Sequence, residues 1–264
     1  MLRSAEGLCS FWDFLNLQTI QNGKTDDPEE GMHLPIAEGL IHVWTACYSD
    51  LEQDYPFPSV QLSKEELLKA AGYKKTGESQ RYIIRCGLVR AVLGSYPGED
   101  PDKIQFVYGL NGKPELDPEH SVSDTRFSLS STDEKVCLGI TRKSGIGVDI
   151  VRPQPHYPFS AIGHSLFTRG ERRWIAQAAP DRRSMRFFRV WALKEALLKA
   201  TGSDVRIMKE ADVSPVMTDA FLDGFYSVNL GETDQRCFIY ESGCGVGHHC
   251  ALATIPKTNS EPDN

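Results

Sequence analysis

Two acidic side chains, Asp149 and Glu195, occupy positions where apolar residues would be expected. Asp149 lies in the stretch GIGVDIV, in which every second residue is isoleucine or valine, as on one face of a strand. Glu195 and Lys199 lie one turn apart in RFFRVWALKEALLKATG, whose apolar residues recur at helical spacing. Charged groups are seldom buried unless they are paired or bind something. Carboxylates from a strand and a helix would suit Mg²⁺, which takes one or two of them together with water and phosphate oxygens.

The same residues also admit a structural interpretation. A Glu and a Lys four residues apart are typical of a surface ion pair, and an acidic residue in a strand is usually solvated. Gly145 and Gly147 share the strand face of Asp149, and their missing side chains would permit a ligand to approach closely. Spacing alone therefore leaves the metal site and the surface ion pair open.

Composition limits the classes of protein to consider. The chain has 264 residues, 40% hydrophobic and 25% charged, which is typical of a soluble globular protein with one sizeable core or two modest ones. Its formal net charge of −7 argues against a general nucleic-acid binder, which must neutralise phosphates. No apolar run is long enough to span a membrane and no export signal is evident, so we expect a cytoplasmic protein.

The cysteines indicate reduced thiols. There are seven, an odd number without regular spacing. In the stretch GCGVGHHC, four side chains could be considered as zinc ligands: Cys244, His248, His249 and Cys250. We prefer a plain strand for this segment, because it continues as HHCALATI with alternating residues.

The pattern predicts an α+β fold in two halves, each with helices followed by strands. Helices are expected from Ser63, where Glu66 completes a capping box, and over 78–94, 170–178 and 186–202. Strands are expected over 40–48, 104–109, 127–132, 134–141, 145–151, 225–230, 236–241 and 248–255, with a hairpin-length connection at 142–145. Residues 1–38 form an N-terminal extension whose polar run QNGKTDDPEEG is expected to be a loop, and 257–264 a disordered tail.

The combination of GVDI with WALKEALLK resembles the 4'-phosphopantetheinyl transferases, in which a strand G-[IV]-D-[IV] precedes a helix W-x-x-K-E-A-x-x-K. Other motifs follow in the order of that family: an arginine-containing helix, GESQRYIIRCGLVRAVL; a turn, Gly112-Lys113-Pro114; and a strand similar to F-N-x-S-H-S, here Phe127 to Thr132. The resemblance covers about residues 40 to 256, and the length resembles the larger, single-chain (Sfp-like) type.

This resemblance implies a transfer reaction. Coenzyme A and an apo acyl carrier protein, or a peptidyl or polyketide carrier domain, would give the holo carrier protein and 3',5'-ADP with Mg²⁺. The implied fold has two similar lobes in a pseudo-twofold arrangement, here 39–147 and 148–256, with coenzyme A between them. A monomer is expected, since one chain would supply both lobes. A helix face turned toward that cleft could be apolar and still carry charged residues.

The resemblance also assigns roles to residues. Asp149 and Glu195 would hold the metal and, with Lys199, act in catalysis. Cofactor binding would fall to the arginine helix, the GKP turn, the serine strand and the motif helix, through Arg81, Lys113, Pro114, Ser130, Ser131, Lys194 and Lys199. Two positions depart from the family pattern: Val151 replaces a frequent third carboxylate, and Ser131 replaces a phosphate-contacting histidine. Coenzyme A binding would then depend more on Arg81, Lys113 and nearby lysines such as Lys69, Lys74 or Lys75.

Seven arginines between Arg169 and Arg189 form a further cluster. They could be a solvated helix face, or a docking surface for an acidic carrier protein. Two other functions remain open from sequence: another Mg²⁺-dependent phosphotransferase or nucleotide hydrolase, and a non-catalytic carrier-binding protein. The joint presence of Asp149, Glu195 and Lys199 argues against the second of these.

Overall fold

The computed structural model describes residues 16–21, 24–26, 36–54, 62–96, 100–101, 103–109, 111–121, 123–155, 157–203, 205, 207–222, 224, 226–230 and 236–255. Most of the N-terminal extension and the C-terminal tail, for which a loop and disorder were predicted, lie outside the described residues. Within the described part, helices and strands mix as an α+β fold, as the sequence pattern predicted.

The first sheet holds five strands within the described residues, in the order β2-β1-β3-β7-β6, and neighbouring strands are antiparallel. Their bounds are β1 Asn16–Gln21, β2 Lys24–Asp26, β3 Leu40–Cys47, β6 Thr125–Ser131 and β7 Lys135–Arg142. The short strands β4 (Phe106–Tyr108) and β5 (Pro114–Leu116) pair separately. The helices of this half are α2 (Tyr48–Asp54), α3 (Lys64–Ala71) and α4 (Thr76–Leu93).

The second sheet is also antiparallel and, in the described part of the chain, has the order β8-β11-β10-β9. Its strands are β8 Gly145–Val151, β9 Tyr226–Asn229, β10 Arg236–Gly243 and β11 His249–Ile255. The segments between β8 and β9 form α5 (Ser160–Leu166), α6 (Arg169–Ala176), α7 (Pro180–Thr201), α8 (Ile207–Glu210) and the 3₁₀ turn η2 (Ser214–Val216).

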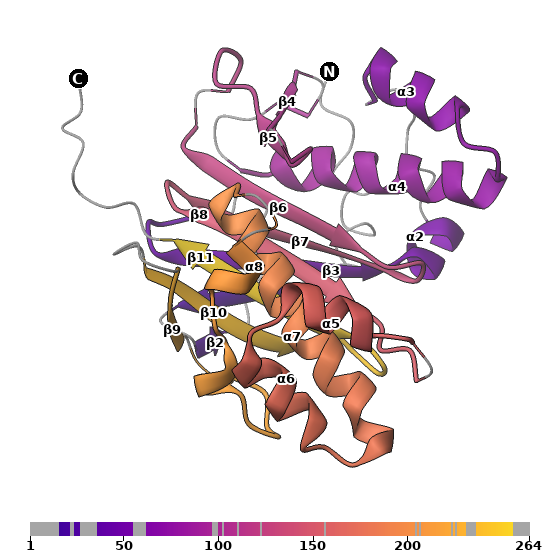
Figure 1. The fold of residues 1–264 in the computed structure, drawn as a ribbon. Helices are drawn as coiled ribbons and strands as arrows, with labels where there is room; N and C mark the ends of the chain where they lie inside the picture. Colours follow the sequence, from indigo (N-terminus) through magenta and orange to yellow (C-terminus); the bar gives the residue numbers. More distant parts are fainter. Residues whose placement is uncertain are drawn as a thin grey trace.

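The elements stack in the order helix, sheet, sheet, helix. Figure 1 shows α4 along the outer side of the first sheet and α7 along the outer side of the second. Apolar residues of α4 pack on β3, β6 and β7, and those of α7 pack on β8, β10 and β11. A third apolar cluster joins the sheets, with Ile41, Val43 and Cys137 against Ile146, Val148 and Ile150. Because β8 also lies against β6, residues of these two strands can form one site.

Local signals explain several helix ends. The predicted capping box of α3 is confirmed: Glu66 N donates to Ser63 Oγ at 3.2 Å and Ser63 N to Glu66 Oε2 at 2.7 Å. Helix α7 has Pro180 in its first turn, where the missing N–H is tolerated, and ends at Gly202 in the left-handed conformation. These ends bound α7 as a 22-residue helix that carries the charged residues of its motif.

Three sequence-based expectations differ from the structure. Residues 142–145 connect strands of different sheets and do not close a hairpin, since β7 pairs with β3 and β6 while β8 pairs with β11. The polar run predicted as a loop contains β2. The bare face of β8 accommodates α7: a Cβ on Gly147 would lie 1.9 Å from Ala196 O, so the missing side chain admits a helix backbone in place of a ligand.

Within the described residues, no helix combines the length and the apolar character that a bilayer crossing requires.

Candidate functional site

Asp149, Lys199 and Ser130 meet where β8, α7 and β6 come together. Lys199 Nζ lies 2.7 Å from Asp149 Oδ1 and also donates to Val148 O at 3.0 Å. Ser130 Oγ donates to the same Asp149 oxygen at 2.8 Å. Asp149 is only 7% exposed, so its charge is held by specific partners instead of by bulk water. The structure therefore brings together three of the residues that the sequence singled out.

Glu195 lies one helical turn before Lys199 and faces a cavity of about 270 Å³, here called the α7 cavity. The cavity is lined by Asn111, Gly112, Lys113, Pro114, Ser128, Leu129, Glu195, Leu198, Lys199 and Gly202. Burial raises the pKa of Glu195, the nearby Asp149 charge raises it further, and Lys199 partly opposes both. The ion pair of Lys199 is with Asp149 and not with Glu195, contrary to the alternative of an i,i+4 surface pair.

The donor set at this position is compatible with Mg²⁺. Asp149 and Glu195 supply hard oxygen donors close enough for the charge of one to shift the pKa of the other. Val151 is buried and offers no oxygen, and no cluster of three His, Cys, Asp or Glu side chains suitable for a metal occurs among the described residues. A metal here would therefore need water and ligand phosphates to complete its shell, which is the usual situation for Mg²⁺.

Lys113 of the GKP turn reaches across to the second sheet. Its Nζ donates to Ile146 O at 2.8 Å and to Lys199 O at 2.7 Å. Burial lowers the pKa of this amine to about 8, with a further lowering from Lys199 and an opposing effect of Glu115. Lys113 and Pro114 line the α7 cavity as predicted for cofactor residues, but the ammonium also braces the end of α7.

A second cavity, the α4 cavity, adjoins the first and has a volume of about 350 Å³. It shares Gly112, Pro114, Leu129 and Lys199 with the α7 cavity and adds both predicted serines. The remaining lining residues are Glu66, Lys69, Tyr82, Arg85, Cys86, Val89, Phe106, Tyr108, Phe127, Ser130 and Ser131. Together the cavities form a cleft between α4, the β4–β5 hairpin and α7.

The arginine that faces this cleft differs from the one expected. Arg85 lines the α4 cavity and its Nη1 donates to Ser131 Oγ at 3.2 Å. Arg81, one helical turn earlier, is not among the lining residues, and its Nη1 lies 4.0 Å from the Cβ position of Gly77. Sequence reasoning missed Arg85 because both arginines carry the same charge on the same helix. Only the packing of α4 on β6 determines which of the two arginines lies close to Ser131.

Lys194 does not reach the cleft, in contrast to its predicted cofactor role. It is 0% exposed, and its Nζ lies 2.9 Å from Glu171 Oε1. The ammonium also donates to the carbonyl oxygens of Met208 and Ala211. Lys194 thus ties α7 to α6 and to the segment around α8. Its neighbour Glu195, about 100° further round the helix, faces the cleft.

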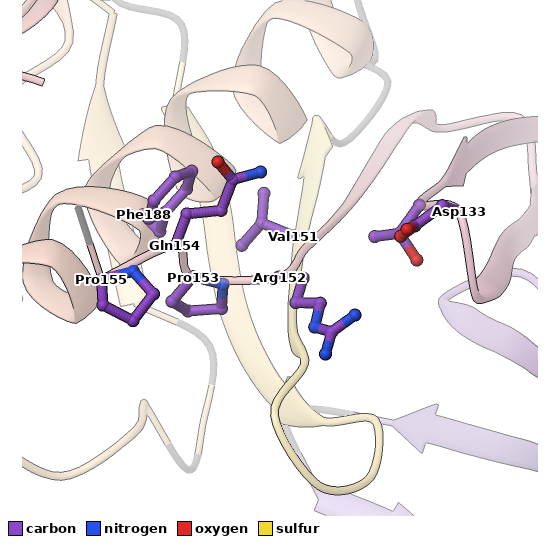
Figure 2. Close-up of a pocket in the computed structure, with 8 residues that line it drawn as sticks. Asp133, Val151, Arg152, Pro153, Gln154, Pro155 and Phe188 are labelled. Carbon is purple, nitrogen blue, oxygen red and sulfur yellow. The ribbon is translucent and has the colours of Figure 1, made fainter. Parts of the chain in front are cut away.

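A third cavity of about 680 Å³, the Val151 cavity, opens at the other end of β8. Figure 2 shows Asp133 on one side, Gln154, Pro155 and Phe188 on the other, and Val151 and Arg152 between them. Val151 follows Asp149 by two residues on the same strand face, so this cavity lies next to the Asp149 carboxylate along the strand. The cleft and the Val151 cavity therefore flank Asp149.

The stretch GCGVGHHC, the candidate zinc site, does not line the cleft. Cys250 Sγ is 3.3 Å from Cys137 Sγ in the apolar layer between the sheets, and the His249 ring lies 3.0 Å from Glu241. His249–Ile255 forms β11, as the preferred strand interpretation predicted.

The arginine cluster divides into buried and exposed members. Arg189 is 1% exposed and pairs with Glu241 at 2.6 Å. Arg172 donates to the carbonyl oxygens of His164 and Phe167, and Arg186 pairs with Asp219 at 2.6 Å. The members classed as exposed are Arg169, Arg173, Arg182 and Arg183. A single solvated face does not describe the cluster, because its members serve different structural roles.

With this geometry in place, comparison with known proteins indicates the class. Residues 145–253, from β8 to β11, match the family model described as the 4'-phosphopantetheinyl transferase superfamily. This matched part includes Asp149, Glu195 and Lys199.

Relatives with curated names belong to the same class. The chain is 25% identical over 187 residues to the 4'-phosphopantetheinyl transferase HetI of Nostoc, covering 71% of this chain and 79% of that protein. It is 30% identical over 146 residues to a putative 4'-phosphopantetheinyl transferase of Synechocystis, covering 54% and 58%. A Bacillus subtilis 4'-phosphopantetheinyl transferase is 25% identical over 188 residues, covering 71% and 79%. The family match and these relatives together support the enzyme class 4'-phosphopantetheinyl transferase.

Proposed function

We propose that this protein transfers the 4'-phosphopantetheine group of coenzyme A to a serine hydroxyl of an apo acyl or peptidyl carrier protein. The products would be the holo carrier protein and 3',5'-ADP. The observation that carries the proposal is Lys199, which lines both cleft cavities and pairs with Asp149, together with Glu195 one turn earlier in the wall of the α7 cavity. Nucleotide would occupy the cleft, and its diphosphate would lie against these side chains.

In the proposed reaction the serine oxygen attacks the phosphorus that carries pantetheine. The bond from this phosphorus to the bridging oxygen breaks, and the leaving 3',5'-ADP takes the electron pair. Phosphoryl transfer of this kind depends chiefly on alignment and on neutralising oxygen charge. Asp149 and Glu195 would hold Mg²⁺, whose charge would stabilise the diphosphate and the leaving group.

The other residues of the site would position the reacting groups and neutralise the charge of the phosphates. Lys199 is fixed by Asp149 and Val148 O, which holds its ammonium at the cavity wall facing the phosphates. Glu195 would accept the proton of the serine hydroxyl, directly or through a water. Ser130 orients Asp149 by donating to it. Lys113 would add positive charge to the cofactor side of the cleft.

The acceptor would approach from the side opposite the nucleotide. The Val151 cavity lies at that side of Asp149 (Figure 2) and offers apolar surface from Val151, Pro153 and Phe188. We further propose that the halves form the two pseudo-twofold lobes of the larger, single-chain type, acting as a monomer. The first half lines the cleft through α4, the β4–β5 hairpin and β6, and the second half lines it through α7.

A transfer assay with the full chain tests the proposal. The protein is incubated with coenzyme A, Mg²⁺ and an apo carrier protein, and the carrier is weighed by mass spectrometry. The expected result is a gain of one phosphopantetheine group per carrier, abolished by Glu195→Gln. Nucleotide breakdown without carrier modification would indicate a hydrolase instead. Carrier binding with neither reaction would indicate a non-catalytic homologue.

A further inference from the structure

The turn between β4 and β5 meets the C-terminal end of α7. Asn111 Nδ2 donates to Gly202 O at 3.1 Å and also to Ser203 O. Two residues after Asn111, Lys113 Nζ donates to Lys199 O at 2.7 Å. Backbone carbonyls at the end of α7 are therefore bound by side chains of one short turn, which belongs to the first half of the chain.

The end of a helix needs donors of this kind. The last four C=O groups of an α-helix have no N–H donor one turn further on. For Lys199 O that donor would be Ser203 N, and this group donates to Thr201 Oγ1 at 3.1 Å. An ammonium such as that of Lys113 is favourable here, because the C-terminal end of the helix dipole is negative. The turn thus supplies the end of α7 with partners from outside the helix.

The side of α7 that faces β8 is made of small residues near this end. A Cβ on Gly147 would lie 1.9 Å from Ala196 O, and one on Gly145 would lie 2.7 Å from Ala200 O. Such residues let the helix approach the strand closely, but they offer few side-chain atoms whose contacts would resist sliding of α7 along β8. Hydrogen bonds to the end of α7 can therefore help to fix its position.

The β4–β5 hairpin is itself anchored, so it can hold the helix end in place. Gly109 N donates to Lys113 O at 3.0 Å and Gly112 N donates to Gly109 O at 2.8 Å, which closes the turn. The ring centre of Phe106 in β4 lies 5.6 Å from that of Phe127 in β6. The hairpin thus links β6 of the first sheet to the end of α7.

We propose that Asn111 is a positioning residue, which holds the last two turns of α7, and with them Glu195 and Lys199, in place relative to β8. The inference rests on the proposed function, which gives those two side chains their roles in the transfer. Both lie within the last two turns of the helix, so a shift of its end moves them directly. A misplacement of about 1 Å can cost about 100-fold in rate.

Hydrogen exchange of the full chain, followed by mass spectrometry, tests this role without a transfer step. In Asn111→Ala, amides of residues 196–203 should exchange about fivefold faster or more, because the hydrogen bonds that hold the helix end are lost. Amides of residues 180–187, at the start of α7, should exchange at the wild-type rate. Thermal melts verify that the variant is folded.

Kinetics separate positioning from ligand binding, because Asn111 also lines the α7 cavity. In Asn111→Ala, kcat should fall about tenfold, while the affinity for 3',5'-ADP, measured by calorimetry, should change less than about threefold. Asn111→Asp keeps the tendency to form turns but cannot donate, so it should lower kcat at least as much. Gln177→Ala, which removes an exposed amide at the end of α6, is the control and should change neither exchange nor kcat.

The outcomes are distinct from those of the proposed function. Wild-type exchange of residues 196–203 in Asn111→Ala overturns the inference. A loss of nucleotide affinity as large as the loss in kcat overturns it too, because Asn111 would then act as a ligand contact. An Asn111→Asp protein with wild-type kcat likewise overturns it. If the wild-type protein transfers nothing, the proposed function fails, and the exchange comparison still decides whether Asn111 holds the end of α7.

Discussion

The amine of Lys113 gives this site a pH signature. Burial lowers its pKa to about 8, so the ammonium becomes neutral as the pH rises past that value. The sign for stability is the opposite of that for binding: between pH 8 and the ordinary lysine pKa the unfolded chain holds more protons, so the cost of burying this charge is progressively removed as the pH rises. Cofactor binding loses a positive charge over the same range.

We therefore expect the KM for coenzyme A to rise about threefold to tenfold between pH 7 and pH 9. Lys113→Arg should lack this rise, because arginine does not titrate there. Initial rates at several pH values measure both profiles, with the carrier protein held at saturation. Identical profiles for wild type and Lys113→Arg would show that another group titrates.

The carboxylates give a metal-dependent signature. Asp149→Asn retains an acceptor for Lys199 and Ser130 but removes the charge, and we expect kcat to fall about 100-fold or more. Half-saturation should then require more Mg²⁺, and chelation by EDTA should abolish wild-type turnover. Glu119→Gln, at an exposed acid outside the cleft, is the matched control. Unchanged Mg²⁺ dependence in Asp149→Asn would contradict the proposed metal role.

At this scale the sequence was sufficient for some residues and not for others. The meeting of Asp149 with Lys199 agrees with the common site that the resemblance of the two motifs implied. The fate of Lys194 could not, because its partner Glu171 belongs to another helix and only packing brings the two together. Whether Arg81 or Arg85 lines the cleft likewise depends on how α4 is rotated on its sheet. A charged residue on an apolar stripe shows that something compensates it, but not what.

At the scale of elements, the contact of β8 with α7 sets the geometry of the site. A Cβ on Gly147 would lie 1.9 Å from Ala196 O and 2.6 Å from Ala200 N, and both are backbone atoms of the helix that carries Glu195 and Lys199. The helix can approach the strand so closely only because glycine is present.

Gly147→Ala should therefore destabilise the protein by about 1–3 kcal/mol and lower kcat disproportionately, because α7 must move away from Asp149. Gly163→Ala is the control, since the added methyl would meet Phe167 at an ordinary 3.7 Å. Urea denaturation and steady-state kinetics on both variants provide the comparison. A Gly147→Ala enzyme with wild-type kcat would show that the spacing of strand and helix is not critical.

Most elements could be predicted from periodicity and capping, including the capping box of α3 and the long motif helix. Pairing could not. The short connection at 142–145 is typical of a hairpin, yet β8 pairs with β11, about a hundred residues away in sequence. Ile146, Val148 and Ile150 form the apolar face of β8, and this face packs in the layer between the two sheets. Placing β8 in the second sheet, opposite β7, buries that face.

At the scale of the whole molecule, an acidic chain must bring a carrier protein close to its active site. Any docking on the cluster of arginines must use its exposed members, since Arg189 and Arg172 are engaged in the fold. This narrows the sequence-based hypothesis to Arg169, Arg173, Arg182 and Arg183.

The double variant Arg173→Glu and Arg182→Glu should raise the KM for carrier protein about tenfold or more, because rim charges govern association, and the effect should weaken at high salt. The KM for coenzyme A should not change. Arg142→Glu, an exposed arginine at the end of β7 and outside the cluster, is the control for charge reversal elsewhere on the surface. If carrier kinetics are the same in all three proteins, docking occurs elsewhere.

The bracing contacts of Lys113 carry a practical consequence. Because burial lowers the pKa of Lys113 to about 8, its uncharged amine is more abundant near that pH than the uncharged form of ordinary surface lysines. A mild acylating reagent should thus modify Lys113 ahead of solvent-exposed lysines, and nucleotide filling the cleft should shield it. Peptide mapping of the acylated Lys113 would therefore report whether nucleotide occupies the cleft, even in a variant that has no transfer activity.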